Sequence, residues 1–224
     1  MNHTQARFYA TSIKLRIYVI LSCVFAINLL ASQEPLRLEI VRFDYQDVAM
    51  KEQWLSMVKD SQDDDMQKWM LYTDEEIEKV LSGSEQWFSL FVFRLAEKPS
   101  TIFGFIEYDE YDSLCFWKLP YDQGFWLSKE STNQDGLELV KVMKSVGFVN
   151  GIAVHKDYRG RGIAFLLLQY VEELCRHHGM EQLILFVGVD NDKAVRACTD
   201  YGFEICPEYS RGKGLTMKKM IQDE

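Results

Sequence analysis

A basic, glycine-rich turn at residues 159–162 constrains the fold of this 224-residue chain more than any other feature. The letters RGRG closely follow the apolar run VGFVNGIAV at residues 146–154, which predicts a buried strand. They lead directly into residues 163–174, where apolar side chains recur at helical spacing and predict a helix with one face on a sheet. This succession of strand, turn and helix favours an α/β fold.

The same turn has the chemistry of an anion-binding site. The first turn of a helix has backbone N–H groups without intrahelical partners, and the helix macrodipole makes that end partially positive. Gly160 and Gly162 allow backbone conformations that a β-carbon disfavours. Arg159 and Arg161 add guanidinium groups that form charge-assisted hydrogen bonds with phosphate oxygens. We therefore expect the turn to hold a phosphorylated ligand.

The rest of the chain is acidic, which limits the class of partner. The formal net charge is −9, whereas domains that bind nucleic acid are normally basic. This balance argues against a nucleic-acid partner and favours a small-molecule or a cationic one. The cysteines are odd in number, 5, and form no CxxC pair, so neither a disulfide framework nor a zinc or other metal site is indicated. Reduced thiols are typical of a cytoplasmic protein.

Residues 1–34 differ from the rest of the chain. Lys14 and Arg16 precede an apolar run at residues 17–31, which is the layout of a signal peptide or a short membrane anchor. The run is shorter than the ~20 residues of a full membrane span. A start codon assigned too far upstream is a third interpretation. We expect one globular domain over residues 35–224, associated with a membrane only if this segment is retained, and the sequence indicates no oligomeric state.

Strand and helix patterns alternate along this domain. Strands are predicted at residues 36–43, 86–95, 101–111, 146–154, 182–189 and 215–221, and helices at residues 47–60, 73–81, 162–179 and 190–203. The acidic patch at residues 61–66 is expected to be a solvated loop. Residues 112–146 are rich in aromatic residues and turn formers, and fit either a long hairpin packed on the core or the wall of an acceptor pocket. The alternation predicts a mixed sheet with helices packed on it.

Two common nucleotide-binding motifs do not fit the turn. A Walker A loop requires GxxxxGK followed by Ser or Thr, which neither this turn nor a later RGKGLT run provides. A dinucleotide fingerprint requires GxGxxG, but the third position counted from Gly160 is Phe165. The turn matches instead the pattern Arg/Gln-x-x-Gly-x-Gly/Ala, filled by Arg159, Gly162 and Ala164.

With this pattern the chain resembles the GNAT superfamily of acetyl-CoA-dependent N-acetyltransferases. Three pieces occur in register: the strand NGIAV, the turn YRGRGIA with its helix, and N-x-x-A followed by YGF after the next strand. The resemblance covers residues 146–203 by motif and residues 36–221 by the order of elements. It implies an α/β fold with a mixed, largely antiparallel sheet and helices on both faces. It also implies an acyltransferase that moves an acetyl group from acetyl-CoA to a primary amine of a small molecule or protein.

The resemblance implies which residues bind the co-substrate. Backbone groups of the strand end would pair with the pantetheine arm, and amides of the turn would surround the pyrophosphate. Asn191 would contact the arm and also cap its own helix. The expected binding residues are Ile152, Ala153, Val154, Arg159, Gly160, Arg161, Gly162, Ile163, Ala164 and Asn191. Further candidates, for the outer phosphate, are Lys156, Lys193 and Arg196, for which a solvated surface is the other interpretation.

Catalysis requires a base, because an alkyl ammonium titrates near ~10.4 and must lose its proton before attacking a thioester. Glu107 and Asp109 are the candidate bases, and Asn150 is a candidate to position a water. In the family, the position of Cys198 is usually a tyrosine that protonates the departing thiolate. Tyr201 lies three residues later and is the alternative donor. This departure leaves open a CoA-binding regulatory or structural protein with weak turnover.

The acidic residues also suggest the charge of the acceptor. Those at residues 63–65 and 107–112 would steer a cationic acceptor, such as a polyamine, an amino sugar, a lysine or a peptide amine. A merely acidic surface is the other interpretation. A membrane-tethered interaction module is a third class of function, supported by residues 17–31 alone.

Overall fold

The computed structural model describes residues 38–63, 73–83, 89–98, 100–118, 125–128, 137–210 and 214–221. The apolar run at residues 17–31 and the boundary expected at residue 34 lie outside the described residues. Within the described ranges, no helix combines the length and the apolar character that a membrane crossing requires.

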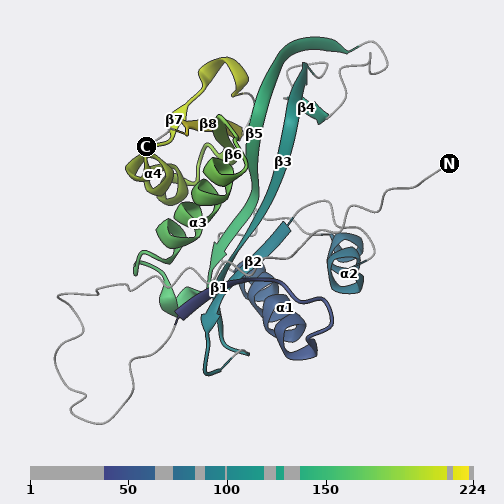
Figure 1. Ribbon diagram of the computed structural model, residues 1–224, viewed down its shortest axis with the longest axis vertical. Helices are drawn as coiled ribbons and strands as arrows, with labels where there is room; N and C mark the ends of the chain where they lie inside the picture. Colours follow the sequence, from purple (N-terminus) through teal and green to yellow (C-terminus); the bar gives the residue numbers. More distant parts are fainter. Residues whose placement is uncertain are drawn as a thin grey trace.

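The described residues form one eight-stranded sheet with helices on both of its faces (Figure 1). The strands are β1 Leu38–Arg42, β2 Ser89–Leu95, β3 Ile102–Lys118, β4 Phe125–Ser128, β5 Glu138–Val154, β6 Gln182–Gly188, β7 Glu204–Ile205 and β8 Gly214–Met220. They follow the order β1-β2-β3-β5-β6-β8-β7, with β4 paired to β3. Every described pair is antiparallel except β5–β6. The mixed, largely antiparallel sheet expected from the sequence is therefore confirmed.

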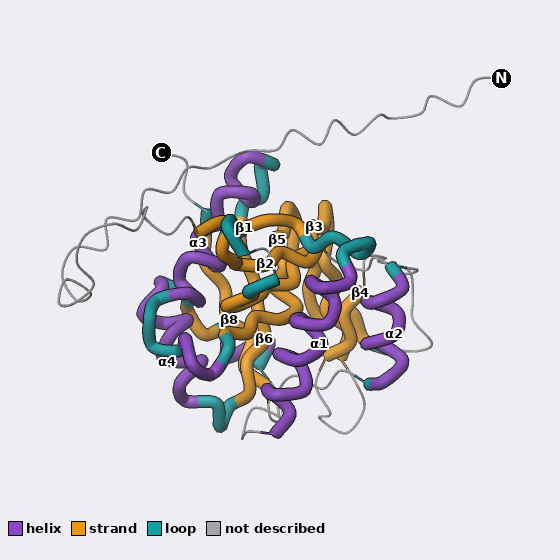
Figure 2. Tube along the Cα trace, turned by 90° about the horizontal axis from the view of Figure 1, so that it is seen from below, coloured by secondary structure: helices purple, strands orange, loops and turns teal. Residues whose placement is uncertain are grey.

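The helices form two layers. They are α1 Val48–Asp63, α2 Asp74–Ser82, α3 Ile163–His177 and α4 Asp192–Tyr201, with short 3-10 turns η3 Lys156–Tyr158 and η4 Pro207–Tyr209. Figure 2 shows α1 and α2 on one side of the sheet and α3 and α4 on the other. We name these sides the α1 face and the α3 face. Trp54 of α1 packs 6.0 Å from the ring of Phe105, whereas Leu167 of α3 and Cys198 of α4 share a second core with Ile106.

The strands β3 and β5 are each longer than the strands predicted from the sequence, and they pair as one long hairpin. Their pairing runs from Gly104↔Val154 to Lys118↔Glu138, so the strands expected at residues 101–111 and 146–154 both continue into the aromatic-rich stretch between them. The long-hairpin interpretation is confirmed for the described part of that stretch. In the helices, α1 reaches Asp63, so the start of the acidic patch is helical rather than a loop.

Two glycines allow α3 to lie close to the sheet. A β-carbon at Gly104 would lie 2.9 Å from Ala153 O and 3.2 Å from a methyl carbon of Ile163 at the start of α3. A β-carbon at Gly147 would clash with Cys175 Sγ near the end of α3. Because both contacts leave no room for a side chain, α3 is held against β3 and β5 at each of its ends.

Candidate active site

The pairing of the parallel strands β5 and β6 ends just before the residues that the family resemblance implies for co-substrate binding. Their pairing begins at Val146↔Gln182 and ends, among the described residues, at Val149↔Leu185, while β5 continues along β3 to Val154. The N–H of His155 donates to Phe103 O on β3 at 2.8 Å. Because successive residues of a strand direct their backbone groups to opposite edges, the N–H and C=O of Val154 point away from β3. The end of β5 thus offers main-chain groups to a ligand.

The turn that follows β5 has the geometry that the glycines predict. Gly160 and Gly162 adopt φ angles of 72° and 78°, in the left-handed region that other residues rarely occupy. Gly162 is the N-cap of α3 and supplies no side-chain hydrogen bond, whereas Thr73 caps α2 and Asn191 caps α4. A β-carbon at Gly160 or Gly162 would meet nothing within 4 Å, so the space beside the turn is open. The first N–H groups of α3 therefore face a site that fits an anion.

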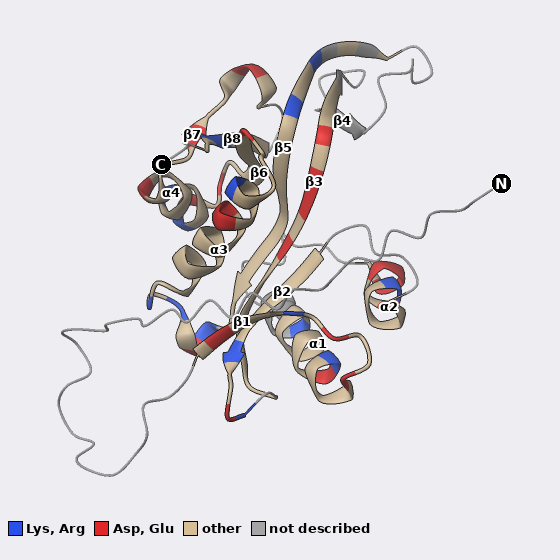
Figure 3. Cartoon of the chain, viewed as in Figure 1, with Lys and Arg blue, Asp and Glu red and all other residues tan. Residues whose placement is uncertain are grey.

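The basic side chains lie around this turn, and Figure 3 shows blue on the connection between η3 and α3. Arg159 donates from Nε to Val154 O at 3.1 Å, which links the turn to the open edge of β5. The guanidinium carbon of Arg161 lies 5.3 Å from the ring centroid of Tyr158. A ligand that pairs with the Val154 carbonyl would have to displace the Arg159 side chain from it.

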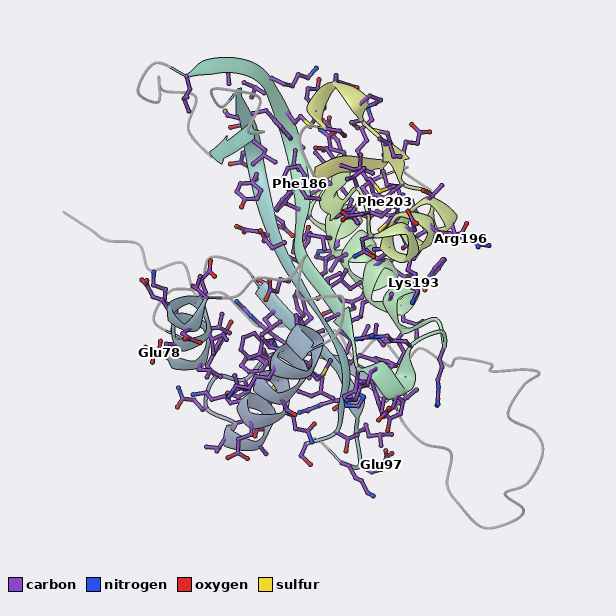
Figure 4. All side chains as sticks on the ribbon, turned by 180° about the vertical axis from the view of Figure 1, so that it is seen from behind. Glu78, Glu97, Phe186, Lys193, Arg196 and Phe203 are labelled. Atoms are coloured by element: carbon purple, nitrogen blue, oxygen red, sulfur yellow. The ribbon has the colours of Figure 1, made fainter. Side chains whose placement is uncertain are left out.

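The start of α4 forms the other side of the gap. Asn191 follows β6 and accepts a hydrogen bond from the N–H of Ala194 at 3.2 Å, as expected of an N-cap. Lys193 is exposed, and Arg196 pairs with Asp200 at 3.7 Å on a largely exposed surface. Figure 4 shows Arg196 pointing away from the body of the protein. Lys193 and Arg196 thus lie on the solvated surface, which was the other interpretation of these residues from the sequence.

The carboxylate of Glu107 is buried on the α1 face. Its side chain follows Phe105 by two residues on β3, and the residue is only 4% exposed. Burial raises the pKa of Glu107 from 4.5 to about 8. Tyr45, in the turn before α1, is near enough for the Glu107 charge to raise the pKa of its phenol, after burial as the larger cause. A carboxylate with a pKa close to neutrality is suited to accept a proton from an ammonium group.

The acidic stretch of β3, red in Figure 3, divides between the two faces of the sheet. Asp109 lies on the α1 face with Glu107. Burial raises the pKa of Tyr111, and the nearby charge of Asp109 and a hydrogen bond with it raise that pKa further. Glu110 lies on the α3 face, where its Oε1 accepts from Tyr108 at 2.9 Å and contacts His178 Nδ1 at 2.6 Å. Only part of the acidic stretch therefore faces the side of Glu107.

Cys198 lies on α4, and its side chain is buried in the core that α4 shares with α3 and the sheet. It is 6% exposed, and burial raises the pKa of its thiol from 9.0 to about 11. The thiol therefore stays protonated near neutral pH. It lies on the α3 face of the sheet and Glu107 on the α1 face, so the structure does not place these two candidates side by side.

The hydroxyl of Tyr201 belongs to a polar cluster on α3, α4 and β8. It donates to Glu172 Oε2 at 2.7 Å, and Lys219 Nζ contacts the same oxygen at 2.7 Å. Burial and the Glu172 hydrogen bond raise the pKa of Tyr201. Burial raises the pKa of Glu172, but the hydrogen bonds from Lys219 and Tyr201 outweigh it and hold that pKa below its usual value. The phenolic proton of Tyr201 is thus already donated to the Glu172 carboxylate.

A group of aromatic side chains on the α1 face was not predicted. We name it the aromatic row; it consists of Tyr111, Phe116, Phe148, Phe186 and Tyr209. Ring centroids of Phe148 and Phe186 lie 5.4 Å apart, and those of Phe116 and Tyr209 lie 5.2 Å apart. The alternation of apolar residues in β5 and β6 and a long hairpin were both visible in the sequence, but the register that brings Phe116 next to Phe186 of β6 was not.

Known protein families and curated proteins include relatives of this chain. The Acetyltransferase (GNAT) family matches residues 50–203, well over half of the chain. A mycothiol acetyltransferase of Corynebacterium aurimucosum is 38% identical over 63 residues, which is 28% of this chain and 21% of that protein. The chain therefore matches about a fifth of that relative's length.

Solved structures share the fold at low sequence identity. A GNAT-family acetyltransferase from Staphylococcus aureus has a TM-score of 0.54 at 12% identity, covering 83% of this chain and 99% of that one. The ribosomal-protein-S18-alanine N-acetyltransferase of Escherichia coli has a TM-score of 0.52 at 13% identity over 84% and 96%. The PaiA N-acetyltransferase of Thermoplasma acidophilum, in complex with coenzyme A, has a TM-score of 0.51 at 19% identity over 82% and 98%. From the family match, the turn and the opened strands together, we conclude that this chain belongs to the GNAT family of acetyltransferases.

Proposed function

We propose that the protein is an N-acetyltransferase that moves an acetyl group from acetyl-CoA to a primary amine, and that residues 35–224 form this catalytic domain. The observation that carries the proposal is the continuity between the open edge of β5 and the N-terminus of α3, which lacks a side-chain cap. A ligand with an extended amide-containing arm and a diphosphate at one end matches this surface. Acetyl-CoA has both parts.

In this proposal, the chain holds the co-substrate mainly through its main chain. Backbone groups of Ile152 and Val154 pair with the arm, in the way a further strand would pair. The N–H groups of Gly162 to Ala164 bind the diphosphate, with Arg159 and Arg161 adding positive charge. Ala153 belongs to the same strand end as Ile152 and Val154, and Ile163 belongs to the same first turn of α3 as Gly162 and Ala164. Asn191 contacts the arm from the end of β6. We also propose that Lys156, Lys193 and Arg196 bind the outer phosphate of the nucleotide part of acetyl-CoA.

Glu107 is proposed as the base. An ammonium ion that enters on the α1 face has to lose its proton, and the buried carboxylate of Glu107 accepts it more readily than an exposed one, because burial raises its pKa to about 8. Asp109 lies on the same face, where it is placed to attract the ammonium, and Asn150 is a candidate to hold a bridging water. The nitrogen then attacks through the gap between β5 and β6, where a strand N–H stabilises the thioester oxygen as charge develops.

The departing thiolate needs a proton, and two side chains near the family's usual donor position were considered for it, Cys198 and Tyr201. Cys198 is a weak hydrogen-bond donor, and the proton of Tyr201 is held by Glu172. The leaving thiol should have a pKa near ~8.5, so its thiolate is a tolerable leaving group near neutral pH. We therefore propose that water delivers this proton, that Tyr201 is the second source, and that positioning of the two substrates supplies much of the acceleration.

A second candidate function follows from the same observation. With a buried thiol at the family's usual tyrosine position, the chain would retain acetyl-CoA binding but catalyse slowly, as a regulatory or structural protein. Binding by titration calorimetry, combined with a screen of primary amines that follows release of the free thiol, separates the two. Binding with turnover supports the enzyme, binding with no turnover on any amine supports the second function, and failure to bind acetyl-CoA overturns both.

The acceptor is proposed to be cationic in solution. Asp109 and the partly exposed acidic surface would steer a positively charged substrate, so kcat/KM should fall as ionic strength rises. A KM independent of salt would show that steering plays no part.

A further inference from the structure

The aromatic row lies beside the point where β5 and β6 separate. Val149↔Leu185 is the last pair of the β5–β6 ladder, and Phe186 is the next residue on β6. Phe186 is two residues beyond Ile184, whose side chain packs with Phe148 on the α1 face. Figure 4 shows Phe186 next to the long strand β5. Its ring therefore stands at the edge of the gap through which the acetyl group has to pass.

Phe186 differs from its neighbours in exposure. Phe116 is fully buried and Phe148 is 6% exposed, whereas Phe186 is 43% exposed. The ring contacts Phe148 at 5.4 Å and Phe116 at 6.5 Å on its inner side. Its outer side is left to solvent. A buried aromatic cluster that ends in one open ring beside a reaction site provides an apolar surface on which a flat group packs.

The row continues into the carboxylates of β3. Asp109 is opposite Phe148 in the β3–β5 register, and residues directly opposite each other project from the same face. Glu107 is two residues away on the same strand, a separation of ~6.6 Å. Phe186 lies on β6, two strands from Glu107 on β3 and about level with it in the register, so the two backbones are about 10 Å apart. A hydrogen bond of ~2.8 Å at the carboxylate and a ring contact of ~3.5–4.0 Å at Phe186 leave about 3–4 Å, the span of two or three carbon–carbon bonds, between the nitrogen and the ring of the acceptor.

We infer that the acceptor is a small primary amine that carries an aromatic ring two or three carbons from its nitrogen, with the ring packed on Phe186. This inference rests on the proposed function, because it names the substrate class of the same site. Charge complementarity places the ammonium at Glu107 and Asp109, and the open ring accepts the apolar end. A short amine without a ring would leave Phe186 exposed. A diamine would gain only a cation–π contact, ~0.5–1 kcal/mol at an exposed site, which is less than an aromatic contact together with the apolar area that it buries.

The test compares three acceptors with the full-length protein: 2-phenylethylamine, ethylamine and 1,4-diaminobutane. We expect kcat/KM for 2-phenylethylamine to exceed that of each of the others by about tenfold, because an aromatic contact and the apolar area it covers together contribute that factor. Equal values, or preference for either amine without a ring, would overturn the inference while leaving the acetyltransferase in place. Thiol release with another amine of the broader screen but with none of these three would overturn the inference alone, whereas absence of release across the whole screen would overturn the proposed enzyme function itself.

Three variants connect the preference to Phe186. Phe186→Ala should raise KM for 2-phenylethylamine about tenfold and leave KM for acetyl-CoA and for ethylamine within twofold. Phe186→Leu retains an apolar side chain and so is expected to fold like the unchanged protein. Its KM for 2-phenylethylamine should lie between those of the unchanged protein and Phe186→Ala. Ile205→Ala is the matched control, since Ile205 is 44% exposed on β7 and lies outside the aromatic row. A loss in Phe186→Ala that is equal for all three amines would show that the ring supports the fold rather than the acceptor.

Discussion

The hydroxyl of Tyr201 donates a hydrogen bond of 2.7 Å to Glu172 Oε2, joining the end of α4 to the middle of α3. Lys219 of β8 completes the cluster, with Nζ 4.2 Å from the centroid of the Tyr201 ring. A tyrosine held in this way fixes the position of α4 relative to α3. Removing the hydroxyl of Tyr201 therefore tests a structural role, through stability, against a role in proton transfer, through kcat.

Tyr201→Phe should lower the free energy of unfolding by about 1–2 kcal/mol, because it removes a hydrogen bond to a charged group. Thermal unfolding should show the loss near neutral pH. It should fade on acidification, since the stability from the depressed pKa of Glu172 is present above the ordinary value and lost as that group protonates. We expect kcat to change by less than about threefold. A fall of ~10²-fold would instead identify the hydroxyl as the general acid.

Gly162→Val should abolish acetyl-CoA binding while the protein stays folded, because a branched side chain would occupy the open space beside the turn. Gly179→Val is a matched control at the other end of α3, with a φ of 71° and nothing within 4 Å of an added β-carbon. Each variant should lose about 1–2 kcal/mol of stability from its left-handed backbone. Calorimetry should show lost affinity only for Gly162→Val. Equal affinities in the two variants would refute the assignment of the turn.

Cys198→Ala should retain most of the activity, within about threefold, because burial keeps the thiol protonated and poorly suited to donate. Cys206→Ala, which removes another buried thiol, controls for the loss of core packing. The measurement is kcat at saturating acetyl-CoA. A fall of ~10²–10⁴-fold in Cys198→Ala with unchanged acetyl-CoA affinity would mean that the thiol takes part in proton transfer.

The pH dependence of kcat should report Glu107. Since the base acts in its ionised form, kcat should rise with pH and reach half its plateau near the pKa of about 8. Glu107→Gln should remove this midpoint and lower kcat by ~10²–10⁴-fold. Asp109→Asn should keep the midpoint. A profile that is flat from pH 6 to 9 in the unchanged protein would contradict the assignment.

Glu107 should also reduce stability at the pH where it acts. Its pKa is raised in the folded state, so the folded protein binds more protons than the unfolded one between about pH 4.5 and 8, and stability falls as pH rises through that window. Glu107→Gln should therefore unfold at a higher temperature than the unchanged protein at pH 8, by roughly 2–4 °C for each kcal/mol recovered. The difference should vanish at pH 4. Equal melting temperatures at both pH values would argue against a buried, proton-binding Glu107.

The part of the site that is local in sequence was predictable. The glycines of the turn, the helical spacing of α3 and the capping asparagine of α4 each express a backbone requirement of their own segment, and all three appear where expected. The face that a side chain takes was harder to infer. Glu107 and Glu110 are three residues apart on one strand, so alternation alone puts them on opposite faces, but it does not say which of the two faces the helix α1. Their roles depend on a register set by β2 and β5.

Contacts between distant segments were not predictable from patterns. The Tyr201–Glu172 bond joins residues 29 positions apart, and nothing in the spacing of either helix requires it. The extra length of β3 and β5 comes from their pairing with each other, which strand propensity alone does not show. The two short strands β4 and β7 were missed because so few residues carry too little pattern.

The two glycines under α3 determine more than packing. Gly104 sets the height of the helix near Ile163, and Gly147 sets it near Cys175, so the pair fixes both the distance and the tilt of α3 above the sheet. The amide groups of the turn are thereby held at one level relative to the edge of β5. A methyl group added at Gly147, far from any ligand, would incline the helix and misalign its first turn with that edge. Affinity for a phosphate group is thus governed partly by a residue at the opposite end of the helix.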